Sequence, residues 1–76
     1  MDSNPAKDFL DRGSEYLEKR NFIAGLREFE KARDLNRRDP EILFKLGLAY
    51  DYLKMFQQAL GCYRKALKIA PDMAGA

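Results

Sequence analysis

The chain has 76 residues, of which 46% are hydrophobic and 34% are charged, with 14 Lys and Arg against 12 Asp and Glu. This length allows one domain, and the interspersed charges argue against a nucleic-acid-binding protein, which normally carries a clustered basic face. No apolar run approaches the roughly 18 residues of a membrane span, and the polar amino terminus lacks the apolar core of a secretory signal. We therefore expect a soluble cytoplasmic protein with neither a membrane nor a nucleic acid as its partner.

The first half of the chain predicts a helical hairpin. Pro5 suits the first position of a helix, where no backbone donor is needed, and the helix is predicted from about Pro5 to Lys19. Arg20 and Asn21 make the turn. A second helix from about Phe22 to Asn36 has apolar residues at helical spacing. Such a short connection forces the two helices side by side and antiparallel.

The second half predicts another hairpin of the same kind. Asp39 followed by Pro40 is a strong signal for a helix start, since Asp can cap the helix and Pro fits its first position. The third helix is predicted to run from Pro40 to Leu53. The fourth is predicted from Phe56 to Ala70, and Pro71 ends it.

The predicted third helix is apolar on two sides. Its main apolar stripe consists of Ile42, Leu43, Leu46, Ala49, Tyr50 and Leu53. Phe44, Leu48 and Tyr52, spaced by four, form a second stripe on the opposite side. A helix of this kind is expected to be covered on nearly every side.

Several residues of the second hairpin follow one spacing pattern: Leu43, Leu46, Gly47 and Tyr50, then Ala59 and Tyr63, then Pro71. This pattern closely resembles the tetratricopeptide repeat. One repeat length earlier, about 34 residues, Gly47 falls on Gly13 and Tyr50 on Tyr16, so a second copy is present. The resemblance implies an all-α fold of two tetratricopeptide helix-turn-helix repeats, with four antiparallel helices in a short right-handed solenoid. The repeats span about residues 6–39 and 40–73, within one domain of residues 1–76, and residues 74–76 are a tail or the opening of a third repeat.

Small residues recur where the helices of each pair should meet. Gly47, Ala59 and Ala66 allow interaxial distances near the low end of roughly 8 to 10 Å. Tyr50 and Tyr63 can then fill the space beside these contacts. We interpret all of these residues as packing residues without chemistry.

The first copy departs from the pattern at three arginines. Arg12, Arg33 and Arg37 stand where the second copy has Leu46, Leu67 and Pro71. Arginine on a side that would meet a preceding repeat is expected of an outermost repeat. Arg33, Arg37 and Arg38 are also the only tight basic group, and we interpret them as a solvated helix end, where cations favour the carboxyl-terminal dipole.

Nothing in the sequence points to catalysis. The chain has no histidine and no Gly-rich phosphate loop, and its carboxylates do not cluster at metal-ligand spacing. The single cysteine, Cys62, excludes an internal disulfide and lies mid-helix without a histidine to activate it. We expect no enzyme activity, no cofactor and no metal.

The resemblance implies a protein-protein interaction module that binds a peptide or a partner helix. In such arrays the first helix of each repeat lines a concave groove. By register, the partner-binding residues would be Lys7, Leu10, Asp11, Ser14, Leu17, Phe44, Lys45, Leu48 and Tyr52. The carboxylate clamp of co-chaperones in this family is absent, because Leu10, Ser14 and Lys45 stand at its positions.

The alternative is a self-assembling scaffold unit. Two repeats bury little surface, and about three are usually needed for a stable array. The wide apolar stripe of the fourth helix would then be covered by another copy, so we expect a homo-oligomer formed through the third and fourth helices. Its contact residues would be Leu60, Tyr63 and Leu67.

Overall fold

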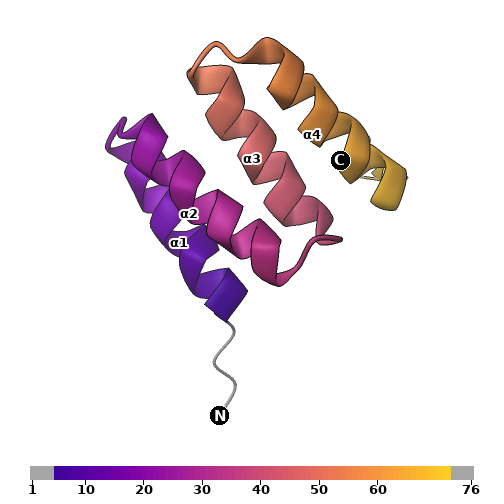
Figure 1. Cartoon of the computed structure of the whole chain (residues 1–76), viewed down its shortest axis with the longest axis horizontal. Coiled ribbons are helices and arrows are strands. Elements are labelled where there is room, and N and C mark those ends of the chain that lie inside the picture. The colour runs from indigo at the N-terminus through magenta and orange to yellow at the C-terminus, as the bar shows by residue number, and fades with distance from the viewer. Residues whose placement is uncertain (1–4, 73–76) are drawn as a thin grey trace.

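The computed structural model describes residues 5–72, and the predicted tail at 74–76 lies outside them. Four α-helices follow one another, α1 (Pro5–Glu18), α2 (Phe22–Leu35), α3 (Pro40–Tyr52) and α4 (Phe56–Ile69), as Figure 1 shows. The all-α prediction is confirmed, and each helix ends one residue before its predicted end. No described helix has the length and apolar character to cross a membrane.

The start of α3 shows why the sequence signal was strong. The Asp39 side chain accepts a hydrogen bond of 3.0 Å from the backbone N–H of Glu41, and Pro40 occupies the first turn. A cap of this kind stabilises a helix by about 1 kcal/mol. It fixes the point at which the second hairpin begins.

Both hairpin turns have the same backbone geometry, although neither contains glycine. Arg20 and Lys54 are in the left-handed region, with φ of 63° and 65°. The Asn21 N–H donates to the Tyr16 carbonyl at 2.8 Å, and the Met55 N–H donates to the Tyr50 carbonyl at the same distance. These bonds close the ends of α1 and α3 in the arrangement that usually has glycine at the left-handed position.

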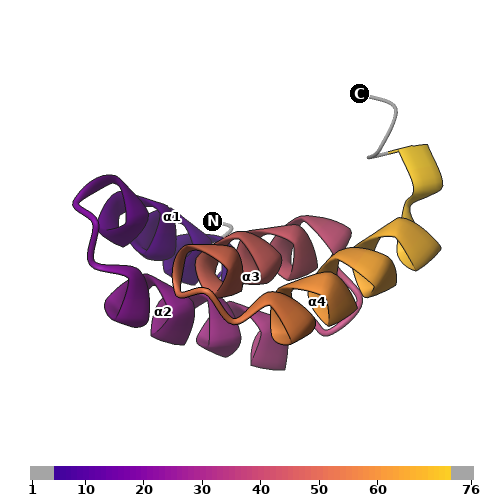
Figure 2. The ribbon, with the colours of Figure 1, turned by 90° about the horizontal axis from the view of Figure 1, so that it is seen from above.

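The helices form two layers. α1 packs against α2 and α3 against α4, while α3 also packs on α2 and touches α1. Figure 2 shows α1 and α3 on one side of the molecule and α2 and α4 on the other. The contacts of α3 with both helices of the first hairpin join the two hairpins into one body.

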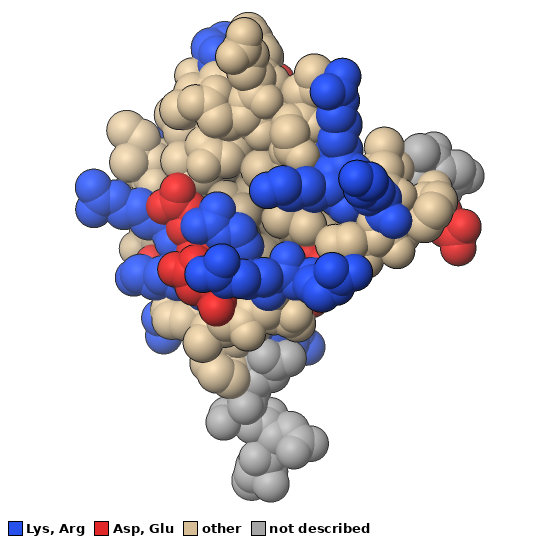
Figure 3. All heavy atoms as spheres, turned by 45° about the vertical axis from the view of Figure 1, so that its right-hand side comes forward, with Lys and Arg blue, Asp and Glu red and all other residues tan. Residues whose placement is uncertain are grey.

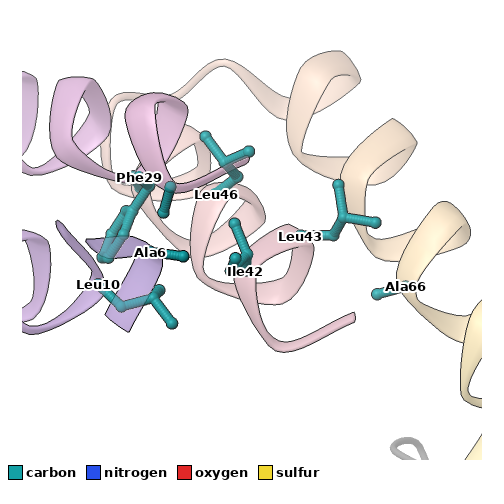
Figure 4. Packing of buried hydrophobic residues seen from close by; sticks show 9 residues of the cluster. Ala6, Leu10, Phe29, Ile42, Leu43, Leu46 and Ala66 are labelled. Carbon is teal, nitrogen blue, oxygen red and sulfur yellow. The ribbon is translucent and has the colours of Figure 1, made fainter. Parts of the chain in front are cut away.

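One hydrophobic core runs through both hairpins (Figure 4). Phe29, Ile42 and Leu46 are its largest fully buried side chains. Around them lie Ala6, Leu10, Ala32, Leu43, Ala49 and Ala66. The core is therefore centred on α3, which contributes more buried residues than any other helix.

The small residues allow close packing, as predicted. A side chain at Gly13 would collide with the Phe29 ring, whose Cδ1 would lie 2.6 Å from the added carbon. The same relationship recurs between Gly47 and the Tyr63 ring, with 2.7 Å to Cδ1. In each hairpin the ring from the second helix lies directly against the backbone of the first.

The two repeats differ on the side of their first helix that would face a preceding repeat. On α3 this side consists of Ile42, Leu46 and Ala49, all buried against the first hairpin. The corresponding positions on α1 are Asp8, Arg12 and Glu15, and all three are exposed. The polar side chains at these α1 positions thus face solvent in this structure. The equivalent α3 side chains instead form the contact between the two hairpins.

Candidate functional site

A hollow of about 400 Å³ lies between the amino-terminal halves of α1 and α3. It brings together five of the predicted groove residues, which are Lys7, Leu10, Asp11, Ser14 and Lys45. Glu41, Asp39, Ala6 and Ile42 complete its lining. Charges of both signs therefore surround this hollow, and Leu10 offers it little surface because its side chain is 9% exposed and belongs to the core.

A second hollow of about 310 Å³ lies at the carboxyl-terminal end of α3. Leu48 and Tyr52 line it together with Asp51 and Lys54. The Tyr52 ring is stacked on the Phe22 ring from α2, with the ring centroids 4.6 Å apart and the planes within 2°. Tyr52 is nevertheless 53% exposed, so a fixed aromatic ring presents one side to solvent.

Two of the predicted groove residues lie outside both hollows. Leu17 is half-buried and packs against the core, close to the Gly25 backbone of α2. Phe44 lies towards α4, where its ring is tilted against Tyr63 with the centroids 5.5 Å apart. Its counterpart in the first repeat, Leu10, is buried, whereas Phe44 is exposed.

Sequence reasoning missed the role of Phe22. It was predicted only as an apolar position of the second helix, but its ring supports Tyr52 of the next repeat. The sequence contained one signal for this contact. Phe22 lies at the start of α2 and Tyr52 at the end of α3, and these two ends lie side by side when consecutive helices are antiparallel. The partner of a solvent-facing aromatic residue can thus come from the preceding hairpin.

The outer side of α4 carries exposed apolar side chains, which we call the end face: Phe56, Leu60 and Leu67. Phe56 and Leu60 are 59% and 49% exposed. Their counterparts one repeat earlier, Phe22 and Leu26, are partly buried, because α3 packs on α2. Tyr63, the third residue predicted for self-association, is half-buried against Gly47.

The pKa values of the Cys62 thiol and the Tyr50 phenol are shifted in favour of the neutral forms. Burial raises the pKa of the Cys62 thiol, although the nearby cations of Lys65 and Arg33 act in the opposite direction. Burial also raises the pKa of Tyr50, and the Glu30 carboxylate adds to this effect. Within residues 5–72, no three His, Cys, Asp or Glu side chains are grouped so that they could hold a metal ion.

The comparison with protein families identifies the second hairpin. The model described as Tetratricopeptide repeat matches residues 40–73, which include α3 and α4. Residues 40–73 therefore form a tetratricopeptide repeat. The first hairpin repeats the glycine-to-ring contact and the left-handed turn of this tetratricopeptide repeat at the same spacing. A search of curated proteins found no match.

Tetratricopeptide repeats generally mediate protein-protein interactions, and the family is typically non-catalytic. Three surfaces of the described residues have been identified: the hollow around Lys7 and Lys45, called the mixed hollow; the hollow around Leu48 and Tyr52, called the aromatic hollow; and the apolar end face. Each of these surfaces can contact another protein.

Proposed function

We propose that this chain binds a segment of a partner protein on the face formed by α1 and α3, without catalysing a reaction. Lys45 lines the mixed hollow, and Leu48 and Tyr52 line the aromatic one. Residues three or four apart on a helix are neighbours on its surface, so these three side chains form one continuous strip along α3. A partner segment lying along this strip would meet both hollows.

The observation that carries the proposal is the state of the Tyr52 ring. Its stacking on Phe22 holds it in place before any partner arrives, and more than half of its surface is open. Aromatic side chains that need little ordering on binding are typical anchors of protein interfaces. Leu48 beside it adds an apolar contact, which favours a partner segment with an apolar residue at this point.

The charges of the mixed hollow favour a polar stretch next to that apolar residue. Lys7 and Lys45 supply cations, and Asp11 and Glu41 supply carboxylates. Charged groups at the rim of an interface set orientation and specificity more than affinity. The proposed partner segment is therefore amphipathic, with one apolar anchor and flanking polar residues.

A random-peptide display selection against the immobilised protein tests this proposal. Selected peptides should perturb the backbone amide signals of Ser14, Lys45, Leu48 and Tyr52 in a nitrogen-15 spectrum. Tyr52→Ala should weaken their binding at least about tenfold, the loss expected for an interface anchor. Selected peptides that perturb only the outer side of α4 would contradict the proposal.

A control must separate loss of the anchor from loss of stability, since Tyr52 also packs on Phe22. Phe22→Leu removes the stacked ring but leaves Tyr52 on the surface. Both variants lose an aromatic pair of about 0.5 to 1.5 kcal/mol, so their unfolding free energies should fall by similar amounts. Tyr52→Ala should then lose most of its binding and Phe22→Leu a smaller part, because its Tyr52 ring is still present but no longer held by stacking. An equal loss in both would show that the exposed Tyr52 surface is not itself the contact.

A second candidate function is self-association through the end face. Phe56, Leu60 and Leu67 are exposed on α4, whereas α3 covers the corresponding side of α2. Stacking of a second copy's α1 onto this face is unfavourable, because Asp8, Arg12 and Glu15 would stand where α3 has buried Ile42, Leu46 and Ala49. A symmetric pair in which the α4 helices meet avoids these charges.

Sedimentation velocity separates the two candidates. If the end face pairs two copies, the wild type should sediment as a dimer at high micromolar concentration, and Leu60→Asp with Leu67→Asp should sediment as a monomer. Ile23→Asp is a matched control, because Ile23 is also an exposed aliphatic residue but lies on α2. A monomeric wild type, or equal effects of both changes, would exclude this role of the end face.

A further inference from the structure

A third hollow, of about 280 Å³, lies between the α2–α3 connection and the carboxyl-terminal half of α4. Its lining contains four cationic side chains and two apolar ones: Arg37, Arg38, Lys65, Lys68, Leu43 and Ile69. Among the described residues 5–72, no carboxylate lines it. Figure 3 shows blue side chains across the middle of this face, with red ones among them on the left and one at the right-hand edge.

The four cations of this basic hollow have no anionic partner within residues 5–72. The ion pairs found there join Lys31 to Glu28 and Arg33 to Asp34, and they use none of the four. Asp39 is next to Arg38 in sequence, but its carboxylate caps α3 by accepting the Glu41 N–H. Like charges held around one hollow repel each other, and a bound anion would relieve this repulsion.

Helix dipoles neutralise only part of this charge. α2 ends at Leu35 and α4 at Ile69, so the carboxyl-terminal poles of both helices lie near the hollow. Each carboxyl-terminal pole is equivalent to about half a negative charge. The amino-terminal pole of α3, which also lies near the hollow, opposes them with about half a positive charge, so at most about one negative charge stands against four cations. The larger part of the positive charge remains available to an anionic ligand.

We propose that this basic hollow binds an acidic segment of a partner protein, with carboxylates on the four cations and one apolar side chain over Ile69 and Leu43. Charge complementarity favours the carboxylates, and the apolar floor favours a peptide side chain. No aromatic residue of the described part of the chain lines the hollow, so this part offers no surface on which the bases of a single-stranded nucleic acid could stack. The site shares no lining residue with the two hollows of the α1–α3 face and is independent of the function proposed for it.

Nitrogen-15 spectra of the full chain test this inference with a defined probe, a pentapeptide of four glutamates around one central leucine. At low ionic strength the peptide should shift the amide signals of Arg37, Arg38, Lys65 and Lys68 together. A matched peptide of four glutamines around leucine should shift them far less. The shifts should also diminish as salt rises from about 0.02 to about 0.3 M, because added ions screen exposed charges.

Paired substitutions distinguish the hollow from the general charge of the protein. Lys65→Gln with Lys68→Gln should weaken binding of the glutamate peptide about fivefold, the effect expected from losing two exposed ion pairs. Lys19→Gln with Arg27→Gln removes the same charge from exposed positions outside the hollow and should leave the affinity unchanged. All four positions are exposed, so both double variants should remain folded, which circular dichroism would check.

Three outcomes would overturn the inference. Equal losses in both double variants would show non-specific attraction, and shifts confined to the α1–α3 face would show that the hollow is not used. The third is tighter binding of a short oligothymidylate to the same residues, which would assign the hollow to nucleic acid. The function proposed for the α1–α3 face would survive all three outcomes, since its test uses different residues.

Discussion

The Tyr63 ring occupies the space that a side chain at Gly47 would need. A carbon added at Gly47 would lie 2.5 Å from Cε1 and 2.7 Å from Cδ1 of that ring. Real carbon atoms do not approach so closely, so α3 or the ring would have to move. The contact between the two helices of the second hairpin therefore requires glycine at this position.

The first prediction concerns that contact. Gly47→Ala should lower the free energy of unfolding by about 1 to 3 kcal/mol, the usual cost of overpacking, despite the better helix propensity of alanine. Gly61→Ala is the control, because Gly61 is also in a helix but has open space around it. It should raise stability by about 1 kcal/mol. Urea unfolding measures both changes, and a stabilising Gly47→Ala would contradict the packing described.

The second prediction concerns the left-handed turn residues. Lys54→Gly should stabilise the protein by about 0.5 kcal/mol, because relief of the left-handed strain slightly exceeds the entropy cost of glycine. Arg27→Gly, at an exposed position within α2, should instead destabilise it by about 1 kcal/mol. Thermal unfolding of the two variants checks the opposite signs. A loss of stability in Lys54→Gly would show that the turn carries no strain to relieve.

The third prediction compares the same repeat position in the two hairpins. Leu46 is fully buried on α3, and Leu46→Ala should cost about 2 to 5 kcal/mol. Arg12 is its exposed counterpart on α1, and Arg12→Ala should change stability by less than about 0.5 kcal/mol. Chemical unfolding provides both values. Similar costs at the two positions would mean that the α1 side of the chain is also covered in solution.

The fourth prediction concerns the Cys62 thiol. Because burial raises its pKa, the pH midpoint of its alkylation by iodoacetamide should lie above that of the urea-unfolded chain. The Lys65 cation favours the thiolate, so Lys65→Gln should move the midpoint further upward. Lys54→Gln serves as the control, because Lys54 does not contribute to this pKa. A midpoint that falls in Lys65→Gln would reverse the assigned direction.

The helices and their contacts could be predicted from the sequence because their signals are local. The Asp39–Pro40 start and the Pro71 stop bound the second hairpin, and the regular spacing of Gly47 and Tyr63 indicated where its helices meet. These features lie within one hairpin. They were sufficient for the fold class, and they placed each helix end within one residue of its observed position.

The surfaces could be predicted only in part, because they depend on which side each neighbour covers. Register places Leu10 and Phe44 at equivalent positions, yet Leu10 is buried and Phe44 is exposed. The basic hollow was missed for a related reason. Arg37 and Arg38 were interpreted as a solvated helix end, and only the packing of α4 brings Lys65 and Lys68 beside them.

Among the four helices, α4 packs on α3 alone, whereas α3 contacts all of the others. A structure built from such neighbour contacts need not open all at once. Amide protons of α4 should exchange with deuterium first, and those around Ile42 and Leu46 last. Short loops between contacting segments also favour rapid folding, because little chain entropy is lost when each hairpin closes.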